Sequence, residues 1–515
     1  MGAAVGAWDL RADHSGVARG GRPWRRCAGP RDGTGGGEFR TRRRALRGRP
    51  GPGGVDSASM PARLAATVVV LRPAAGPSGV EVALVHRSPR LLFLGNFWAF
   101  PGGAAEAGEG AAEAAAREAR EEVGLALDPG CLRPAGRWTT PAVSPAAYDA
   151  HFFLAAAPEG TELRVGDDEV DDVAWADPRS ALGRWERDEL LLAPPTRVSL
   201  EALARVPRRG ALAPWLEAAA ERVAAAHPPG GVDPGDVELA AGVWLCPVRT
   251  PTLPPATHTN CVLVSGASEL VVIDPASPYA DEQARLDELL DRHRAAGRRV
   301  REVLLTHHHP DHCGGAARLA SRLGVPVAAH RRTRERLAGR GLRVDRCVDD
   351  GEVLALSGGP GAPERRLRAV LCEGHADGHL AFHEERSGIL VAGDMIAGVG
   401  TIVIDPPEGK LGLYLESLAR LRALPSPLLV PSHGPPLGDP RGALTALIEH
   451  RRMRERKVLA ALGPEPLPVE ALLPVAYDDK PPEVWPLAAR AAQAHLEKLA
   501  AEGRAVHEDG RWRRP

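Results

Sequence analysis

The sequence predicts a mixed α/β protein built from more than one domain. A chain of 515 residues is long for one domain, and its 44% hydrophobic and 25% charged residues are ordinary for a globular protein. Apolar, β-branched runs alternate with Ala-, Glu- and Arg-rich helical segments in two stretches, which the Pro- and Gly-rich residues 227–236 separate. We expect an N-terminal α/β domain over 60–226, a linker over 227–236, a second α/β domain over 237–439 and a helical tail over 440–515.

The overall composition excludes several classes of protein. The formal net charge of -1 gives no general attraction to nucleic acid or to anionic membranes. The seven cysteines are scattered and never form a CxxC pair, which indicates reduced thiols rather than a disulfide framework. No apolar run approaches the roughly 18 residues that span a bilayer. We therefore expect a cytoplasmic protein with no membrane partner, and the sequence does not predict its oligomeric state.

Residues 1–59 differ from the rest of the chain. They contain 12 Arg against 5 Asp or Glu, many Gly and no hydrophobic periodicity. Such a segment cannot bury enough apolar surface to offset its ordering entropy. We expect a disordered or non-native extension, with Met60 as an alternative start; a nucleic-acid-binding arm and a targeting segment are the other interpretations.

The N-terminal stretch predicts strands at 67–71 and 80–85, joined by a turn at 75–79. A helix follows at about 110–123, then strands near 147–155 and 170–176 and helical material over 196–226. On the first helix, Glu118, Glu121 and Glu122 lie at positions i, i+3 and i+4, so their carboxylates share one face. A hard divalent cation with oxygen ligands would stabilise that arrangement, whereas the simpler interpretation is a solvated acidic face. Gly124 is expected to cap the helix in the left-handed conformation.

The segment from Gly103 to Leu125 resembles the Nudix box, GX5EX7REUXEEXGU, at every fixed position, with Ala119 where a bulkier aliphatic is usual. The resemblance implies an α/β/α sandwich that hydrolyses a diphosphate joined to another group, with Mg²⁺ or Mn²⁺. Glu118, Glu121 and Glu122 would be the metal ligands and catalytic residues, and Arg117 would orient a carboxylate. Glu169 is a further candidate ligand or base, or part of a solvated acidic loop. Segments 87–90, 138–141, 148–153 and 194–196 are similar to a Nudix subgroup that includes coenzyme A diphosphatases.

The second stretch predicts strands at 261–265, 270–274 and 302–306 and helices at 281–296 and 315–323. Histidines and aspartates follow or border its apolar runs, where strand-end loops can turn them toward one point; they are His307, His309, Asp311, His312, His375, Asp394 and His433. Imidazole suits zinc or iron, and a carboxylate can take part in binding a second ion. A lone histidine is more often packed or solvated, but that explanation would have to cover seven residues at once.

This set resembles the metallo-β-lactamase-fold signature, HxHxDH followed by H, D and H, over about 237–435. The resemblance implies an αββα sandwich that holds two Zn²⁺ ions, or Fe or Mn. His307, His309 and His375 would bind one ion, Asp311, His312 and His433 the other, and Asp394 both. Asp311 would also take part in catalysis. His308 is expected to point away, and His379 to lie behind the ligands or at the surface.

Beyond this core, residues 400–401, 414–418 and 450–455 resemble the lactamase-like endoribonuclease family, which ends in a small winged helix; that fits 440–515. Thioester hydrolases of the glyoxalase II kind share the metal pattern. The leading interpretation is a bifunctional hydrolase that acts on small-molecule diphosphate and thioester substrates. One version of this interpretation links the two halves through coenzyme A.

Two alternatives stay open. In the first alternative, the C-terminal half is an endoribonuclease, which the basic cluster at 451–457 supports. Against it, residues 440–515 carry a net charge of only +2, from 13 basic and 11 acidic residues. The whole chain is a non-catalytic protein that binds a ligand or nucleic acid in the second. In every case we expect few contacts between the halves, because the linker lacks a hydrophobic pattern.

Overall fold

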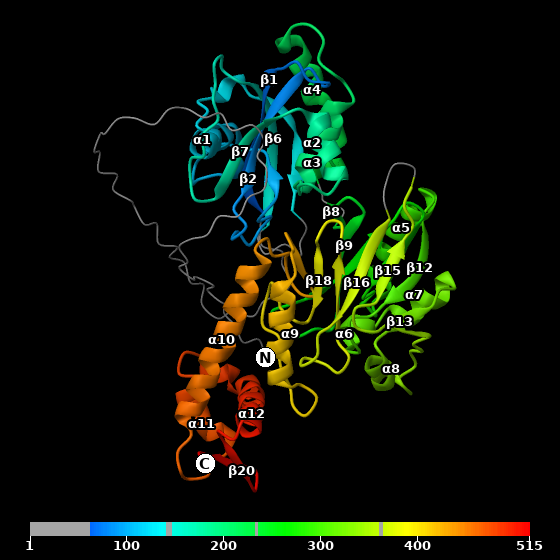
Figure 1. Ribbon diagram of the computed structural model, residues 1–515. Helices are drawn as coiled ribbons and strands as arrows, with labels where there is room; N and C mark the ends of the chain where they lie inside the picture. Colours follow the sequence, from blue (N-terminus) through cyan, green and yellow to red (C-terminus); the bar gives the residue numbers. More distant parts are fainter. Residues whose placement is uncertain (1–61, 141–146, 232–234, 360–363) are drawn as a thin grey trace, which may run out of the picture.

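The computed structural model describes residues 62–140, 147–231, 235–359 and 364–515. The expectations for residues 1–59 therefore lie outside the described residues. Figure 1 shows an N-terminal α/β body above a C-terminal α/β body, with the last helices extending below the second body.

The N-terminal body is one mixed sheet between two layers of helices. Its sheet runs in the order β3-β2-β1-β6-β5, with β4 paired to β1 and β7 paired to β2. Helix α1 packs on one face and α2, α3 and α4 pack on the other, so each face has its own apolar core. The elements are β1 (Arg63–Pro73), β2 (Val80–Arg87), β3 (Trp98–Ala99), β4 (Gly102–Ala104), α1 (Ala111–Val123), β5 (Arg133–Thr139), β6 (Tyr148–Ala156), β7 (Val170–Ala176), α2 (Pro178–Glu186), α3 (Pro194–Ala204) and α4 (Leu212–Ala226).

The C-terminal body begins with a seven-stranded sheet in the order β14-β13-β12-β11-β10-β9-β8. Helices α5 and α7 contribute apolar side chains to the core on its outer face. Its elements are β8 (Val237–Ala240), β9 (Val243–Arg249), β10 (His258–Ser265), β11 (Glu269–Ile273), α5 (Ala280–Ala295), β12 (Arg299–Leu304), α6 (Pro310–Cys313), α7 (Ala316–Leu323), β13 (Val327–Ala329), α8 (Arg331–Leu337) and β14 (Arg346–Cys347).

A second sheet, in the order β15-β16-β17-β18-β19, packs against the first. The side chains between the two sheets form one continuous buried core, and helix α9 covers the outer face of the second sheet, which gives an αββα sandwich. The elements are β15 (Val353–Leu356), β16 (Arg365–Leu371), β17 (Leu380–Glu384), β18 (Leu390–Gly393), α9 (Leu411–Ala423) and β19 (Leu429–Pro431).

The tail continues from the sandwich through one long helix. Helix α10 packs on α9 at its start and forms a separate small core further along. That core is completed by α11 and α12 and by the hairpin at the C-terminus. The elements are α10 (Pro440–Ala461), α11 (Val469–Ala476), α12 (Trp485–Ala501), β20 (Val506–Glu508) and β21 (Arg511–Arg513). This arrangement confirms the predicted order of an α/β/α sandwich, an αββα sandwich and a winged-helix tail.

Most predicted elements agree with the structure to within a few residues. Gly124 has a φ of 75° and caps α1 in the left-handed conformation, as expected. The helical material predicted over 196–226 is two helices, because the chain breaks between α3 and α4 at a segment containing Pro207 and Gly210.

The expectation of few contacts between the halves is wrong. Phe97, Leu191 and Ala193 of the N-terminal body are buried in the core between the two C-terminal sheets. The side-chain amide of Asn96 donates to the carbonyl oxygen of Pro427 at 2.6 Å. A buried ion pair also joins the bodies, since a guanidinium nitrogen of Arg365 lies 3.2 Å from Asp188. The linker composition did not predict these contacts because all of them lie outside the linker.

The first residue of the predicted linker also packs into the N-terminal body. His227 is buried, and its ring lies 4.7 Å from that of Phe152 and 5.5 Å from that of Trp138, both edge-on.

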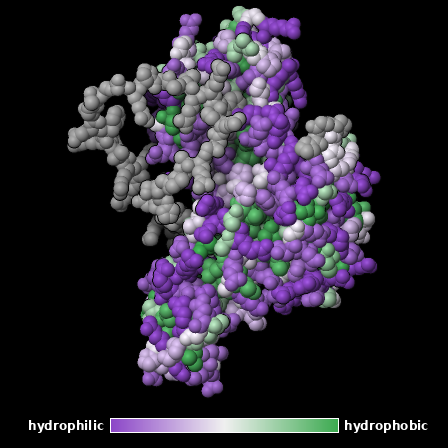
Figure 2. Space-filling view, in the orientation of Figure 1, coloured by the Kyte–Doolittle hydropathy of each residue, from purple (hydrophilic) through white to green (hydrophobic). Residues whose placement is uncertain are grey.

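Most side chains on the face drawn in Figure 2 are hydrophilic. Across the described ranges, no helix combines the length and the apolarity needed to cross a bilayer.

Candidate metal centres

The seven candidate ligands of the C-terminal body come from loops at the ends of neighbouring strands. His307 to His312 follow β12, His375 follows β16, Asp394 follows β18 and His433 follows β19. Strand β12 belongs to the first sheet and β16, β18 and β19 belong to the second. Because the two sheets pack against each other, these loops converge at one edge of the sandwich. The structure thus brings together all seven residues that the sequence singled out.

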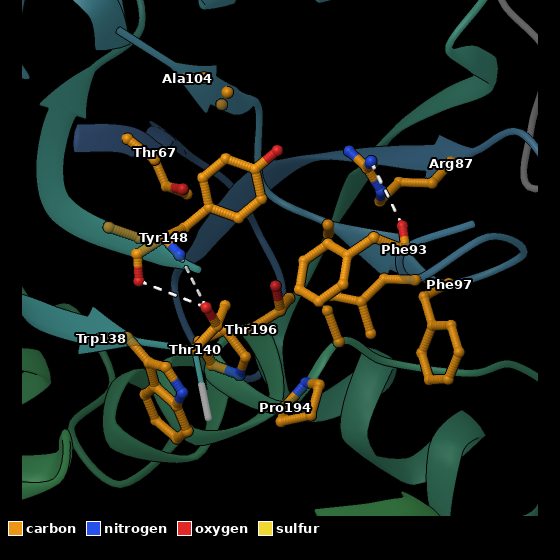
Figure 3. A pocket seen from close by; sticks show the side chains of 18 of the residues that line it. Thr67, Arg87, Phe93, Phe97, Ala104, Trp138, Thr140, Tyr148, Pro194 and Thr196 are labelled. Carbon is orange, nitrogen blue, oxygen red and sulfur yellow. Dashed lines mark hydrogen bonds between the residues drawn. The ribbon is translucent and has the colours of Figure 1, made fainter. Parts of the chain in front are cut away.

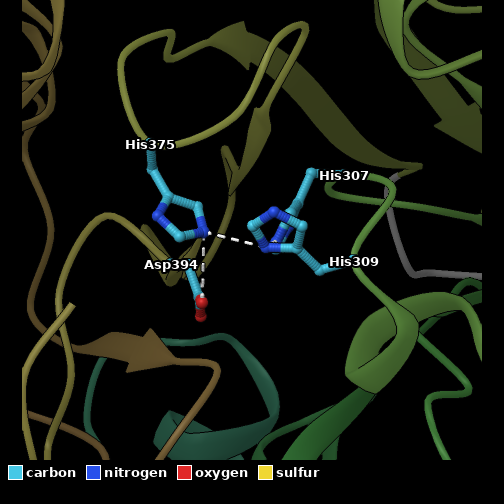
Figure 4. Close-up of side chains that lie close together, drawn as sticks. All are labelled: His307, His309, His375 and Asp394. Carbon is cyan, nitrogen blue, oxygen red and sulfur yellow. Dashed lines mark hydrogen bonds and ion pairs between the residues drawn. The ribbon is translucent and has the colours of Figure 1, made fainter. Parts of the chain in front are cut away.

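The first group consists of three histidines and one carboxylate (Figure 4). His309 Nδ1 lies 2.9 Å from His307 Nε2 and 3.2 Å from His375 Nε2. Asp394 Oδ2 lies 3.4 Å from His375 Nε2. One ligand atom from each of these four residues falls within 4.8 Å of every other, which is the spacing that a single ion requires.

The second group lies on the other side of Asp394. His433 Nε2 is 3.6 Å from Asp311 Oδ2 and 3.5 Å from Asp394 Oδ1. His312 Nε2 is also 3.5 Å from Asp394 Oδ1. The two carboxylate oxygens of Asp394 therefore face different groups, the geometry expected of a ligand shared by two ions.

Four of the five rings, those of His307, His312, His375 and His433, are oriented by a partner on the far nitrogen. His312 Nδ1 lies 2.8 Å from Asp274 Oδ2, and His307 Nδ1 lies 3.0 Å from the hydroxyl of Thr306. The Nδ1 atoms of His375 and His433 lie 3.0 Å and 2.9 Å from the carbonyl oxygens of Val403 and His258. Such contacts turn the Nε2 atoms toward the centre and fix the tautomer that a metal ligand needs.

The chemistry of this donor set fits two cations. His312 Nε2 and Asp394 Oδ1 are buried and have no hydrogen-bond partner among the described residues, which is costly for polar atoms unless a cation satisfies them. Burial lowers the pKa of His307 far below its ordinary value and that of His309 to about 3, so both rings are neutral donors. Burial opposes ionisation of Asp394, but His312 and His433 outweigh it and hold its pKa well below the ordinary value.

Two further histidines of this region are also placed. His308 turns away from the centre to Glu408, whose Oε1 lies 3.5 Å from its Nε2. His379 is fully buried behind Asp394, and its Nε2 accepts the backbone N–H of Asp394 at 3.0 Å. His379 thus supports a ligand and does not lie at the surface.

The candidate site of the N-terminal body is organised by Arg117 on α1. This guanidinium donates to Glu109 at 3.0 Å, to Glu118 at 2.8 Å and to Glu121 at 2.9 Å. A hydrogen bond to the carbonyl oxygen of Ala104, also 3.0 Å long, ties it to β4. Arg117 thereby holds the acidic side chains in place and balances their mutual repulsion.

The three predicted carboxylates differ in their surroundings. Glu121 is half-exposed, whereas Glu122 is only 2% exposed and accepts the N–H of Gly102 at 2.9 Å. Burial raises the pKa of Glu122 to about 8, although Gly102 and Arg87 act in the opposite direction. Burial also raises the pKa of Glu118, against the effect of Arg117. The simpler interpretation, a solvated acidic face, is therefore wrong for Glu122, which points toward the sheet.

The glycine that opens the predicted box has a steric role. A Cβ atom at Gly103 would lie 2.5 Å from Glu118 Oε1, so any larger residue would displace that carboxylate. Glu169, the weaker candidate, lines the same cavity as Glu118 and Glu121. The negative charge of Glu169 also helps to raise the pKa of Glu118.

This cavity has a volume of about 950 Å³ (Figure 3). Aromatic side chains such as Phe93, Trp138 and Tyr148 line it on the N-terminal side. The C-terminal body closes another side with residues of β8, β9 and the 434–436 loop. No sequence pattern predicted this shared wall, because it brings together residues that are far apart in the chain.

The basic cluster of the tail does not form a free cationic face. Arg451 is buried and donates to the carbonyl oxygen of Ile402 at 2.6 Å. Arg454 is buried and pairs with Asp479 at 2.8 Å, and Lys457 pairs with Asp478. Three of the five cationic side chains at 451–457 are therefore bound to groups of the protein itself. This removes the main support for RNA binding.

Sequence reasoning gave no role to some residues that matter at these sites, although Arg87 lies in the segment 87–90 that resembles a Nudix subgroup. Arg87 lines the cavity and has a buried Nε atom without a hydrogen-bond partner among the described residues. Asp188 and Arg365 are 177 positions apart, so no local pattern could pair them.

Three family models match successive parts of the chain. The NUDIX domain matches residues 61–193, the metallo-beta-lactamase superfamily matches 254–433, and the beta-lactamase associated winged helix domain matches 469–512. Beta-lactamase-like protein 2 homolog of Drosophila melanogaster is 30% identical, over 48% of this chain and 83% of its own length. An atrochrysone carboxyl ACP thioesterase of Paecilomyces divaricatus is 29% identical, over 40% of this chain and 59% of its own length.

Solved structures resemble both halves. A metallo-beta-lactamase family protein of Thermus thermophilus is 27% identical, covers 53% of this chain and 99% of its own, and gives a TM-score of 0.44. A NUDIX hydrolase of Alicyclobacillus acidocaldarius is 29% identical, covers 29% of this chain and 95% of its own, and gives a TM-score of 0.27.

Proposed function

Since this chain belongs to the metallo-beta-lactamase superfamily and is a hydrolase that carries a NUDIX domain, we propose that each half holds its own active centre. The N-terminal centre cleaves a diphosphate linkage, and the C-terminal centre opens a thioester or a similar bond. The observation that carries this proposal is that acidic side chains gather around Arg117 and that a separate group of histidines and aspartates gathers around Asp394, with no residue in common.

The metal ions implied by both families would activate water and neutralise charge that develops on the substrate. We propose Mg²⁺ or Mn²⁺ at Glu118, Glu121 and Glu122, because hard cations prefer carboxylate oxygens. Two Zn²⁺ ions, or Fe or Mn, would suit the histidine-rich centre.

In the N-terminal centre, the chain's own residues position and tune the carboxylates. Arg117 fixes Glu118 and Glu121 side by side, while the N–H of Gly102 holds Glu122. Because its pKa is raised to about 8, Glu122 carries a proton at neutral pH in the absence of a cation. Cation binding should therefore release that proton.

In the C-terminal centre, the rings of His307, His309 and His375 face one side of Asp394 and those of His312 and His433 face the other. Asp311 lies beside His433 and is more exposed than that ring, so we propose that it contacts substrate as well as metal. A thioester substrate is supported by the relative that is named as a thioesterase. Coenzyme A contains a diphosphate and forms thioesters, and it would link the two activities.

The test uses the full chain and two variants that serve as controls for each other. Glu121→Gln should abolish diphosphate cleavage and leave thioester hydrolysis unchanged, and Asp394→Asn should do the reverse. Wild type and both variants are assayed on coenzyme A, an acyl-coenzyme A, a nucleoside diphosphate sugar and RNA, with products identified by mass spectrometry. Loss of both activities in either single variant would contradict two separate centres.

A further inference from the structure

The cavity beside Glu118 and Glu121 is built by both halves of the chain. Val237 and Leu239 of β8, Leu245 and Pro247 of β9, and Pro435 and Pro436 of the 434–436 loop form its C-terminal wall. At about 950 Å³ the cavity lies at the upper end of the range for small-molecule sites, which are roughly 300–1,000 Å³. A diphosphate held near the carboxylates leaves much of that volume for the group attached to it.

The C-terminal wall is almost entirely apolar. Its described residues include no Asp, Glu, Lys or Arg. Asn260 lines it, but the amide nitrogen already donates to the carbonyl oxygens of Pro431 and Gly434 at 2.7 and 2.8 Å. His258 also lines it, and its Nδ1 already pairs with the hydroxyl of Thr257 at 2.8 Å. Sugar hydroxyls against this wall would lose hydrogen bonds to water and find few replacements, which disfavours them.

The opposite end of the cavity suits phosphate. Arg87 and Arg63 line the cavity at this end, and Arg87 has a buried Nε without a hydrogen-bond partner among the described residues. Arg117 also lines it, but its donors already serve Glu109, Glu118 and Glu121. Guanidinium groups recognise phosphate oxygens by charge-assisted hydrogen bonds. Charge is therefore concentrated at the N-terminal end, and apolar surface at the C-terminal wall.

We propose that the C-terminal body completes the substrate pocket of the N-terminal centre, and that its substrate is a diphosphate carrying an extended apolar arm that packs on this wall. The inference rests on the proposed diphosphatase activity. The arm would pack on Val237, Leu245 and Pro436, while water adds across one P–O bond of the diphosphate. The oxygen of water forms a bond to one phosphorus, and the bridging oxygen leaves with the other phosphorus.

The test uses adenosine diphosphate esters of methanol, butanol and octanol, which differ only in their apolar arm. Each would yield adenosine monophosphate and the alkyl phosphate. For the full chain, kcat/KM should rise with arm length by up to about fourfold per buried methylene, the amount that apolar burial supplies. Uridine diphosphate glucose should be a poor substrate. Affinity for the three esters, measured by calorimetry in EDTA, should follow the same order without turnover.

Val237→Glu and Pro436→Glu place a charge on the wall and should remove this dependence on arm length, so that the butyl and octyl esters are no longer preferred over the methyl ester. Val475→Glu adds the same charge at an exposed valine of the tail, outside the cavity, and should behave as wild type. An unchanged circular dichroism spectrum and an unchanged urea unfolding midpoint show that a variant is folded. If wild type cleaves all three esters equally, or if both wall variants keep the dependence, the composite pocket is refuted although the diphosphatase stands. If wild type cleaves no ester and no other diphosphate, the proposed function itself fails.

Discussion

The buried ion pair between the two bodies supports a test of how strongly they are joined. Asp188 lies 3.2 Å from Arg365 and 2.8 Å from Arg386, and its side chain is fully buried. Its φ is 58°, a left-handed conformation that asparagine also tolerates. Asp188→Asn therefore keeps the shape and the backbone while it removes one charge.

The expected cost follows from what remains around the two arginines. Removing one partner of a buried ion pair usually costs about 3–5 kcal/mol, because the other charge is left uncompensated. Here Arg365 keeps Glu384, at 2.8 Å, and asparagine keeps one acceptor oxygen. We therefore expect the lower end of that range, about 3 kcal/mol, which corresponds to roughly a hundredfold change in a local opening equilibrium.

Hydrogen exchange followed by mass spectrometry measures this opening equilibrium peptide by peptide. It does not require the multidomain chain to unfold in two states. Peptides covering 188–193 and β16 should exchange about a hundredfold faster in Asp188→Asn. Arg366→Gln is the matched control, since this neighbouring arginine makes a partly exposed pair with Glu385 at 2.8 Å. Such surface pairs contribute about 0–1 kcal/mol, so exchange should change less than about fivefold. Equal exchange in the two variants would refute the view that the ion pair holds the bodies together.

Three further predictions concern single residues. Asp394→Asn should purify with at least one transition-metal ion fewer than wild type, because this carboxylate faces both ligand groups, and full metal content would refute its assignment. Glu122→Gln should leave metal-free stability in urea at pH 7 nearly unchanged, since burial raises the pKa of Glu122 to about 8 and the native group is already protonated; a large loss would contradict that protonation state. Burial lowers the pKa of His227 to about 4, so the folded protein disfavours the protonated ring. The free energy of unfolding should therefore fall by up to about 3 kcal/mol as the pH drops from about 6.5 to about 4. His227→Gln should show a smaller loss over the same window in urea unfolding, and an identical loss would show that this histidine does not titrate as inferred.

The sequence predicted those features that depend on local pattern. The spacing of Glu118, Glu121 and Glu122 predicted that the three side chains share one face of a helix. The motif around His307 predicted candidate ligands at the end of a strand. The burial of Glu122 was not predicted, because helical periodicity says which side chains share a face but not what covers that face. The basic cluster at 451–457 misled for the same reason, since Arg454 and its partner Asp479 meet only through the packing of α10 against α11.

Contacts between the bodies could not be predicted from one sequence, yet they bear on both centres. His258 lines the cavity of the N-terminal centre, and its carbonyl oxygen accepts from His433, a candidate ligand of the other centre. Asn260, two residues along β10, also lines the cavity. Its side-chain amide donates to the carbonyl oxygens of Pro431 and Gly434, which flank His433 in the chain. One strand of the C-terminal body therefore lines this cavity with its side chains and, through the carbonyl oxygen of His258, orients His433, a candidate metal ligand. A linker alone would join the two bodies only by proximity, whereas this strand makes the second body part of the wall of the cavity beside Glu118 and Glu121.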